Sequence, residues 1–324
     1  MNASDSLLVE VSGKESMISS DYLVDGIENL VGYDPSYEVI SIGHGVPIIH
    51  LPIVSDNAEM MFVRRGALRL KDVATGASIG HTSRFVEALR QTIEYGLEEL
   101  LPRSHTRTLS SDTSAERIKI LVERLLDKQL AQIIPALSIY SAVQSIRRFE
   151  SWQVYFNQAQ EEILLKGLVL EFLVNDQWLP FTALSDGTKR IFYILSEILA
   201  ESAFMVDITP EDVEVEITSL KKIIFLEEPE LGIHPKQLTK LLNLIREVSK
   251  EHQVIMTTHS PQVLDMLTEK ELDRITVCTL DPKKGTQFHK LSRAKQAQTR
   301  TYMREVGFLS DYWRYSFLEE TDAE

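Results

Sequence analysis

The sequence contains one cysteine, Cys278, among its 324 residues. A single thiol excludes an intramolecular disulfide and a zinc site built from several cysteines. The chain also lacks an apolar run of about 18 residues, so no transmembrane helix is expected. Its first residues lack the basic and apolar segments of a signal peptide. These absences predict a soluble, cytoplasmic protein with no membrane partner.

Positive charge is also scarce. The chain carries 34 Lys and Arg against 48 Asp and Glu, which gives a formal net charge of −14. A protein that coats nucleic acid by bulk electrostatics needs clustered cations. Nucleic acid is therefore expected as a partner only through a local patch or a complex. The hydrophobic content of 44% is ordinary for a globular protein, and the length suffices for two lobes.

A phosphate-binding loop of the form Gly-x-x-x-x-Gly-Lys-Ser/Thr is also absent from the sequence. In such a loop the glycines let backbone N–H groups wrap the phosphates. The nearest segment is 11–16, where Gly13 and Lys14 are present but Glu15 replaces the hydroxyl residue. The Glu15 carboxylate would place negative charge beside a phosphate. Lys14 is therefore a candidate phosphate ligand. The alternative is that Gly13 and Lys14 stand together by chance.

Apolar periodicity divides the chain into three parts. In 1–82, short β segments separated by glycine are expected. In 83–165, apolar residues recur every three or four positions and predict a helical lobe, including helices over 84–101 and about 137–162. In 166–324, β segments alternate with helices, which indicates an α/β fold with a mostly parallel sheet and right-handed crossovers.

The last part contains a predicted hairpin and the strands of the predicted sheet. The hairpin joins 168–174 to 177–180 through Asn175 and Asp176. A helix is expected to begin at Pro235, which suits a first-turn position. The strands of the parallel sheet are expected at 221–228, 253–258 and 273–280.

Adjacent acids end the first of these strands. Ile223–Leu226 is apolar and is followed by Glu227 and Glu228, after which Pro229 stops the strand because it cannot donate to a ladder. Two carboxylates at a buried strand end can hold a metal ion and a water beside a phosphate. A solvated strand end is the ordinary structural explanation.

Two further polar segments stand on either side of these acids in the sequence. Before them, Leu184-Ser-Asp-Gly-Thr188 directly precedes a helix, where a simple N-cap turn is the ordinary explanation. After them, Thr257-Thr-His-Ser260 follows an apolar strand. His259 in this segment is a candidate catalytic residue, and a purely structural histidine is the alternative. Ser260 and His259 do not form a hydrolase pair, because neighbours on a strand point to opposite faces.

In this order the three segments resemble the ABC-type ATPases of the SMC/Rad50-like class. Within this class, the chain resembles in particular the small bacterial AAA-type and OLD-like ATP-binding proteins associated with anti-phage defence. The resemblance extends from about residue 165 to residue 315. It implies an ABC-ATPase head with a mostly parallel sheet flanked by helices, a helical insertion lobe and antiparallel β elements. Glu227 departs from the pattern of many relatives, which have Asp there.

The resemblance also implies a role for each segment. Glu227 would hold Mg²⁺, Glu228 would polarise the attacking water as general base, and His259 would reach the γ-phosphate of ATP. The signature loop would bind ATP held by the opposite subunit at a helix N-terminus. Its residues are Leu184, Ser185, Asp186, Gly187 and Thr188. A homodimer or higher oligomer with ATP between its heads follows from this arrangement.

The expected function is therefore ATP binding and hydrolysis by a sensor or regulator in DNA-related anti-phage defence, with a nuclease or toxin as effector partner. The missing phosphate loop leaves three explanations: a loop on another polypeptide, a divergent loop within 1–80, or a pseudo-ATPase. In the last case the chain is a non-hydrolysing scaffold that docks an effector. A metal-dependent nuclease is disfavoured, because no second strand adds acids to Glu227, Glu228, Glu230 and His234.

Overall fold

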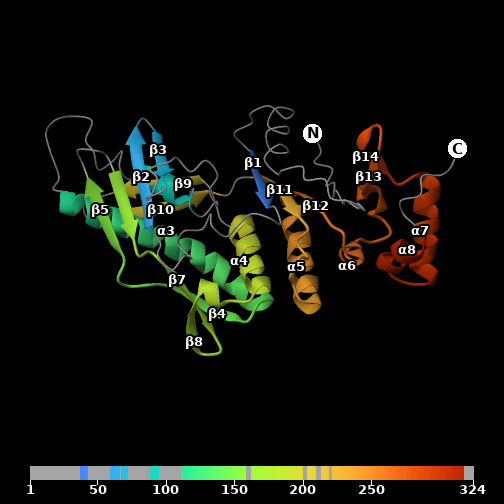
Figure 1. The fold of residues 1–324 in the computed structure, drawn as a ribbon, viewed down its shortest axis with the longest axis horizontal. Coiled ribbons are helices and arrows are strands. Elements are labelled where there is room, and N and C mark those ends of the chain that lie inside the picture. The colour runs from blue at the N-terminus through green and yellow to red at the C-terminus, as the bar shows by residue number, and fades with distance from the viewer. Residues whose placement is uncertain are drawn as a thin grey trace. The chain divides into compact units, whose positions relative to one another are not determined.

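The computed structural model describes ten segments of the chain: 37–42, 59–65, 67–71, 86, 88–94, 111–157, 162–199, 203–208, 213–218 and 221–316. The chain divides into two compact units, whose elements are labelled in Figure 1. The first unit combines 1–45 with 221–324, and the second is 46–220. The first unit thus contains the paired acids and the histidine segment, and the second contains the candidate signature loop. The division at 82 and 165 stays a prediction.

The first unit contains a three-stranded parallel sheet in the order β1, β11, β12. Its strands are β1 (Tyr37–Ile42), β11 (Lys221–Glu227) and β12 (Gln253–Thr257). Residues 222–226 of the central strand are buried, as is typical of parallel strands covered on both faces. The predicted strands 221–228 and 253–258 are thus confirmed as parallel neighbours, whereas the place of β1 in this sheet was not predicted.

Helix α5 (Pro235–Val248) connects β11 to β12, as predicted. Its buried residues recur at helical spacing and form one apolar face: Leu238, Leu241, Leu242 and Ile245. Pro235 occupies the start of the helix, and the preceding His234 caps it, because the imidazole Nδ1 accepts a hydrogen bond from the Lys236 amide at 3.3 Å.

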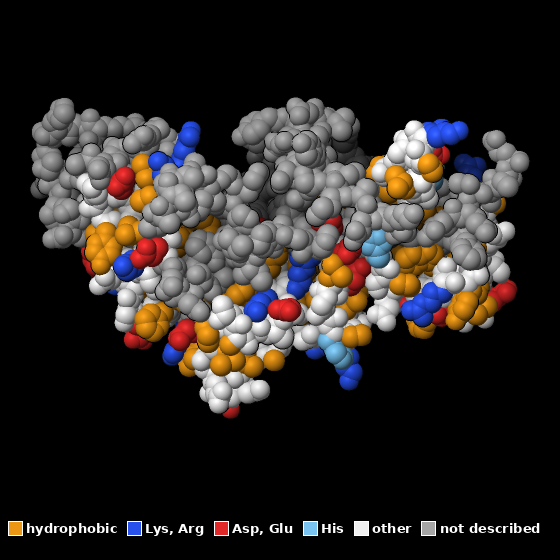
Figure 2. All heavy atoms as spheres, viewed as in Figure 1, with side chains coloured by type: hydrophobic (Ala, Val, Ile, Leu, Met, Phe, Trp, Pro, Cys, Tyr) orange, Lys and Arg blue, Asp and Glu red, His pale blue; other side chains and the backbone are white. Residues whose placement is uncertain are grey.

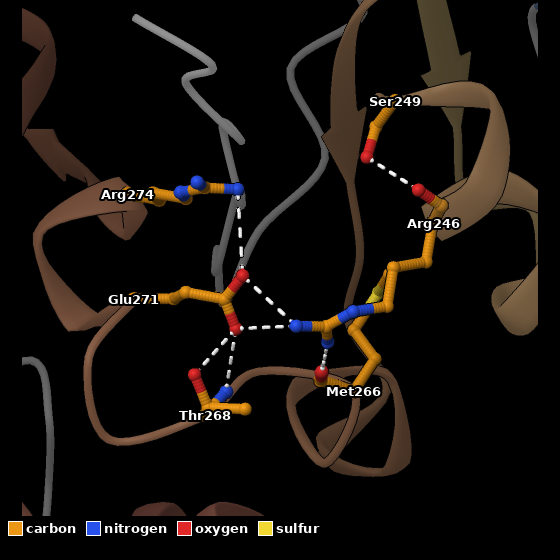
Figure 3. Close-up of polar contacts among 6 residues, drawn as sticks. All are labelled: Arg246, Ser249, Met266, Thr268, Glu271 and Arg274. Atoms are coloured by element: carbon orange, nitrogen blue, oxygen red, sulfur yellow. Dashed lines mark hydrogen bonds and ion pairs between the residues drawn. The ribbon is translucent and has the colours of Figure 1, made fainter. Parts of the chain in front are cut away.

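The end of α5 is tied to the segment that follows the histidine loop (Figure 3). Arg246 donates to both carboxylate oxygens of Glu271, at 3.0 and 2.8 Å, and to the carbonyl of Met266. The Thr268 amide and hydroxyl donate to the same carboxylate at 2.9 and 2.7 Å. Burial alone would raise the pKa of Glu271, but the hydrogen bonds from Thr268 and Arg246 outweigh it and lower that pKa.

The remaining elements of the first unit follow in chain order: α6 (Pro261–Leu264), η4 (Leu272–Arg274), β13 (Thr276–Asp281), β14 (Gly285–Lys290), α7 (Arg293–Glu305) and α8 (Leu309–Ser316).

The strand expected at 273–280 forms, but its expected place in the parallel sheet is wrong, because β13 pairs antiparallel with β14. The Asp281 carboxylate accepts from the amides of Lys283 and Lys284, which closes a tight turn and returns the chain alongside β13.

The second unit contains three antiparallel sheets among its described residues. One has the order β3, β2, β6, β5, with β2 (Glu59–Arg65), β3 (Ala67–Lys71), β5 (Gln153–Asn157) and β6 (Glu162–Lys166). Another comprises β4 (Val143–Arg148), β7 (Leu170–Val174) and β8 (Gln177–Pro180). The third pairs β9 (Ala203–Ile208) with β10 (Val213–Thr218). Its helical elements are residues 88–94, α3 (Ser111–Tyr140), η3 (Phe181–Ala183) and α4 (Asp186–Leu199).

The predicted hairpin is confirmed as β7 and β8. Its turn residues Asn175 and Asp176 have φ of 49° and 63°, the left-handed values that a two-residue hairpin turn requires. The helix expected over 84–101 is confirmed for 88–94, and the rest of that range lies outside the described residues.

The helix expected over 137–162 is wrong beyond Tyr140, because residues 143–148 and 153–157 form the strands β4 and β5. Val143 and Ile146 are both buried although they are three residues apart, a spacing that imitates a helix. A register shift between Val143 and Ser145 allows both side chains to be buried on a strand.

Three phenylalanines hold the start of α4 in place. Phe181 of η3 and Phe192 of α4 pack against Phe172 of β7, with ring centroids 5.1 to 5.7 Å apart within this cluster. All three side chains are buried. Because Phe181 and Phe192 flank residues 184–188 in sequence, the cluster fixes the loop that leads into α4.

The surface carries charges of both signs. On the face drawn in Figure 2, the coloured acidic and basic side chains are interspersed over the described elements. No helix in the described part of the chain is both long and apolar enough to cross a membrane.

Candidate functional site

The paired acids lie where β11 ends and the chain turns. The Glu228 amide donates to the Thr257 carbonyl at 3.0 Å, which extends the ladder between β11 and β12 by one bond. Glu228 has φ of 42°, a left-handed conformation that costs a non-glycine residue about 1–2 kcal/mol. The amide of Leu231 donates to the Glu228 carbonyl at 3.1 Å and closes the turn. Strained residues of this kind cluster at functional sites.

His259 lies beside Glu228. The imidazole Nε2 is 2.9 Å from the carboxylate Oε1 of Glu228, so an Nε2–H donates to the carboxylate. The Glu228 side chain is 18% exposed and that of His259 is 46% exposed, so the pair opens to solvent on the histidine side. It lies at the carboxyl ends of two adjacent parallel strands, where open α/β sheets bind ligands.

A third acid holds the backbone of the histidine loop. Glu230 Oε1 accepts hydrogen bonds from the amides of His259 and Ser260, each at 3.2 Å, and from the Thr258 hydroxyl. Sequence reasoning considered Glu230 only as a nuclease ligand and missed this contact. No pattern indicates it, because the partners lie 28 to 30 residues away and meet only when β11 and β12 pair.

The metal role suggested for Glu227 stays a prediction, and the structure gives the position of this residue. It ends β11 opposite Thr257 in the register of the sheet. The described residues contain no group of three or more His, Cys, Asp or Glu that could hold a metal. Mg²⁺ in nucleotide sites needs only one or two carboxylates besides phosphates and waters, so Glu227 fits such an ion. His234 caps α5 rather than joining the acids.

The candidate signature loop is an N-cap turn in the second unit. Ser185 Oγ accepts from the Thr188 amide at 3.2 Å and lies 2.9 Å from the Thr188 hydroxyl. Leu184 and Thr188 are buried, whereas the Asp186 side chain is 96% exposed and lies 3.5 Å from the Lys189 ammonium. Gly187 is in the first turn of α4.

The structure therefore brings together Glu227, Glu228 and His259 in one unit. The loop from Leu184 to Thr188 lies in the other unit. Lys14 lies outside the described residues. The chemistry available at the strand ends is a carboxylate acceptor, an imidazole donor and a second carboxylate suited to a hard cation.

Comparison with known proteins gives one family and several partial relatives. The family described as "AAA domain, putative AbiEii toxin, Type IV TA system" matches residues 70–265. The Septu protein PtuA of Bacillus thuringiensis is 28% identical over 92 residues, which is 28% of this chain and 22% of that protein. The uncharacterised protein MJECL43 of Methanocaldococcus jannaschii is 31% identical over 65 residues, 20% of this chain and 16% of that protein. The matched stretches thus span less than a quarter of these relatives.

Among solved structures, the chain is similar to an Smc head domain with an extended coiled coil, bound to the C-terminal domain of ScpA, from Pyrococcus furiosus. The TM-score is 0.37 at 14% identity, over 60% of this chain and 42% of that one. An Smc head domain with a coiled coil and joint from Pyrococcus yayanosii gives a TM-score of 0.36 at 14% identity, over 60% and 32% of the two chains.

Proposed function

Because the chain belongs to the AAA-domain family whose description names an AbiEii toxin and a type IV toxin–antitoxin system, we propose that it is an ATPase of the ABC type. In this proposal it binds and hydrolyses ATP between two copies of its head and acts as a sensor or regulator. The single observation that carries the proposal is the Glu228 and His259 pair, 2.9 Å apart at the ends of β11 and β12. The family match includes both residues.

Each residue of the pair has a defined task in hydrolysis. The Glu228 carboxylate would accept a proton from the water that attacks the γ-phosphorus, while the bond from that phosphorus to the β,γ-bridging oxygen breaks. The His259 Nε2–H, which donates to Glu228 in this structure, would instead donate to a γ-phosphate oxygen when ATP is bound. Mg²⁺ held by Glu227 would neutralise the phosphate charge. Glu228 and His259 thus supply one acceptor and one donor for the reaction.

The second half of the site would come from another copy of the chain. Residues 184–188 lie at the start of the 14-residue helix α4, whose N-terminus favours anions. A head-to-head dimer would present this loop to ATP bound by the partner. A role in DNA-related anti-phage defence with a nuclease or toxin partner rests on the sequence resemblance.

Trapping of the ATP-bound dimer tests this function. Glu228→Gln keeps the size of the side chain but removes the proton acceptor, so the variant is expected to form an ATP-dependent dimer that persists. Size-exclusion chromatography with light scattering, with and without ATP and Mg²⁺, measures it. A matched control is Glu251→Gln, because Glu251 is exposed after α5. A monomer under all conditions would contradict the dimer.

One sequence observation favours a second function. The chain has no match to the Gly-x-x-x-x-Gly-Lys-Ser/Thr loop, so the alternative is a non-hydrolysing scaffold that docks an effector. Isothermal titration with a non-hydrolysable ATP analogue separates the two. Binding at micromolar concentration supports the ATPase, whereas no heat of binding together with a stable assembly supports the scaffold.

A further inference from the structure

We propose that Glu230 is a positioning residue that sets the location of the His259 imidazole. The proposal rests on the proposed function for its catalytic consequence, but the contact itself is independent of ATP. Among the described residues, the hydrogen bonds of the Glu230 side chain go to the loop that carries His259, and Glu230 is not assigned to the reacting atoms. It is linked to the loop by three hydrogen bonds to one oxygen, Oε1.

The contacts fix the loop at consecutive residues. The amides of His259 and Ser260 both point at Glu230 Oε1, each at 3.2 Å, and the Thr258 hydroxyl donates to the same atom. The Ser260 amide also donates to the Thr258 hydroxyl at 2.9 Å. With the amides on both sides of the His259 Cα held by one carboxylate, the loop backbone cannot rotate freely, and this determines where the imidazole points.

Glu230 and Glu228 lie on the same short turn on either side of Pro229, which is buried. Glu228 contacts the His259 side chain, and Glu230 contacts the His259 backbone. The turn therefore holds the histidine at two points. A displacement of this turn would move His259 with it, so the acceptor and the donor of the site keep their spacing.

The second carboxylate oxygen argues against a purely stabilising role. Glu230 Oε2 is buried and has no hydrogen-bond partner among the described residues. A buried oxygen without a partner opposes folding. The arrangement is thus better suited to fixing the loop geometry than to adding stability.

The first test needs no ATP. Labelling the full chain with ¹⁵N only at histidine gives one backbone amide signal for each of its eight histidines, and His259→Ala identifies the signal of His259. Glu230→Ala is expected to move that signal upfield in the proton dimension, because its hydrogen bond to a carboxylate is lost. Glu230→Gln retains an acceptor oxygen and should move it less. An unchanged His259 signal in Glu230→Ala would overturn the proposal.

The second test is a double-mutant cycle on ATP hydrolysis. Glu230→Ala is expected to lower kcat by about ten- to a hundredfold through misplacement of His259, with KM for ATP changed less than kcat and partial rescue in Glu230→Gln. In the His259→Ala background the same change should have no further effect on kcat. Full additivity would overturn the positioning role.

The controls separate this proposal from the proposed function. Glu251→Ala removes an exposed carboxylate near the end of α5 and should leave both the His259 signal and kcat unchanged. If the wild-type chain releases no phosphate from ATP, the ATPase proposal fails, while the amide signal still decides whether Glu230 holds the loop. If Glu230→Ala does not fold, the comparison of Glu230→Gln with wild type decides it, and an unshifted His259 signal in that folded variant would overturn the proposal.

Discussion

The imidazole of His259 donates to the carboxylate of Glu228 across 2.9 Å, although the two residues belong to segments separated by the whole of α5. Parallel pairing of β11 with β12 brings them together, because it places Glu227 opposite Thr257 and aligns the two strand ends. In the proposed function, this contact joins the proton acceptor to the donor that would reach the γ-phosphate.

Removal of the donor should slow the reaction without abolishing ATP binding. His259→Ala is expected to lower kcat by about 10²-fold or more, because a positioned donor to the developing phosphate charge is lost. The dissociation constant for a non-hydrolysable analogue should change far less. Steady-state kinetics and titration calorimetry check the two quantities. Equal kcat in variant and wild type would show that His259 has a structural role only.

Complementation between two inactive variants tests whether the signature loop acts on the partner's ATP. Ser185→Arg places a bulky cation in the loop, and Glu228→Gln removes the base. A mixed dimer of these variants contains one site with an intact base and an intact loop, so the mixture should regain activity that neither variant has alone. If the mixture stays inactive while mixed dimers form, the loop does not act across the interface.

Ser185 also has a structural role that can be measured separately. Its hydroxyl accepts from the Thr188 amide and caps α4. Ser185→Ala should therefore lower the free energy of unfolding by about 0.5–2 kcal/mol. Ser185→Asp retains a capping oxygen and serves as the control that keeps the helix start. Urea unfolding followed by circular dichroism measures both; equal losses in the two variants would exclude capping.

The Arg246 and Glu271 contact predicts a pH-dependent contribution to stability. The folded pKa of Glu271 is lowered although burial opposes this, because Thr268 and Arg246 donate to its carboxylate. Its contribution is therefore fully present above the unfolded pKa of about 4.3 and is lost as the pH falls through the lower folded pKa.

Glu271→Gln should accordingly reduce the free energy of unfolding at pH 7 by about 1–3 kcal/mol and make it less dependent on pH below that unfolded value. Urea titrations at several pH values from 7 down to 3 measure this. Glu247→Gln is the matched control, because Glu247 is exposed on α5 and pairs with the exposed Lys250. An unchanged pH profile in Glu271→Gln would refute the assignment.

Local patterns predicted the elements around the site well. The continuous apolar run of β11, the Pro235 start of α5 and the Asn175-Asp176 turn each have a strong local cause, and the structure has all three. Prediction failed where a non-local or irregular feature decides the outcome. The register shift in β4 imitates helical spacing, and the Asp281 turn sends β13 into a hairpin.

In the candidate site, too, residues marked by a local pattern could be predicted, and residues whose contacts depend on the path of the chain could not. Glu228 and His259 could be picked from their positions after apolar strands, because parallel strands end at one edge of a sheet. Glu230 could not be assigned to the histidine loop, since its hydrogen bonds depend on the path of the turn after Pro229. The strained φ of Glu228 is likewise a property of that turn rather than of its residue type.

Release of phosphate from ATP by the purified full chain, compared with its Glu228→Gln variant, tests whether Glu228 is the general base of an ATPase. We expect Mg²⁺-dependent phosphate release by the wild-type chain and a loss of about 10²–10⁴-fold in the variant, because the variant lacks the general base. Equal rates in the two proteins, or no release by a wild-type chain that is folded and supplied with ATP and Mg²⁺, would contradict it.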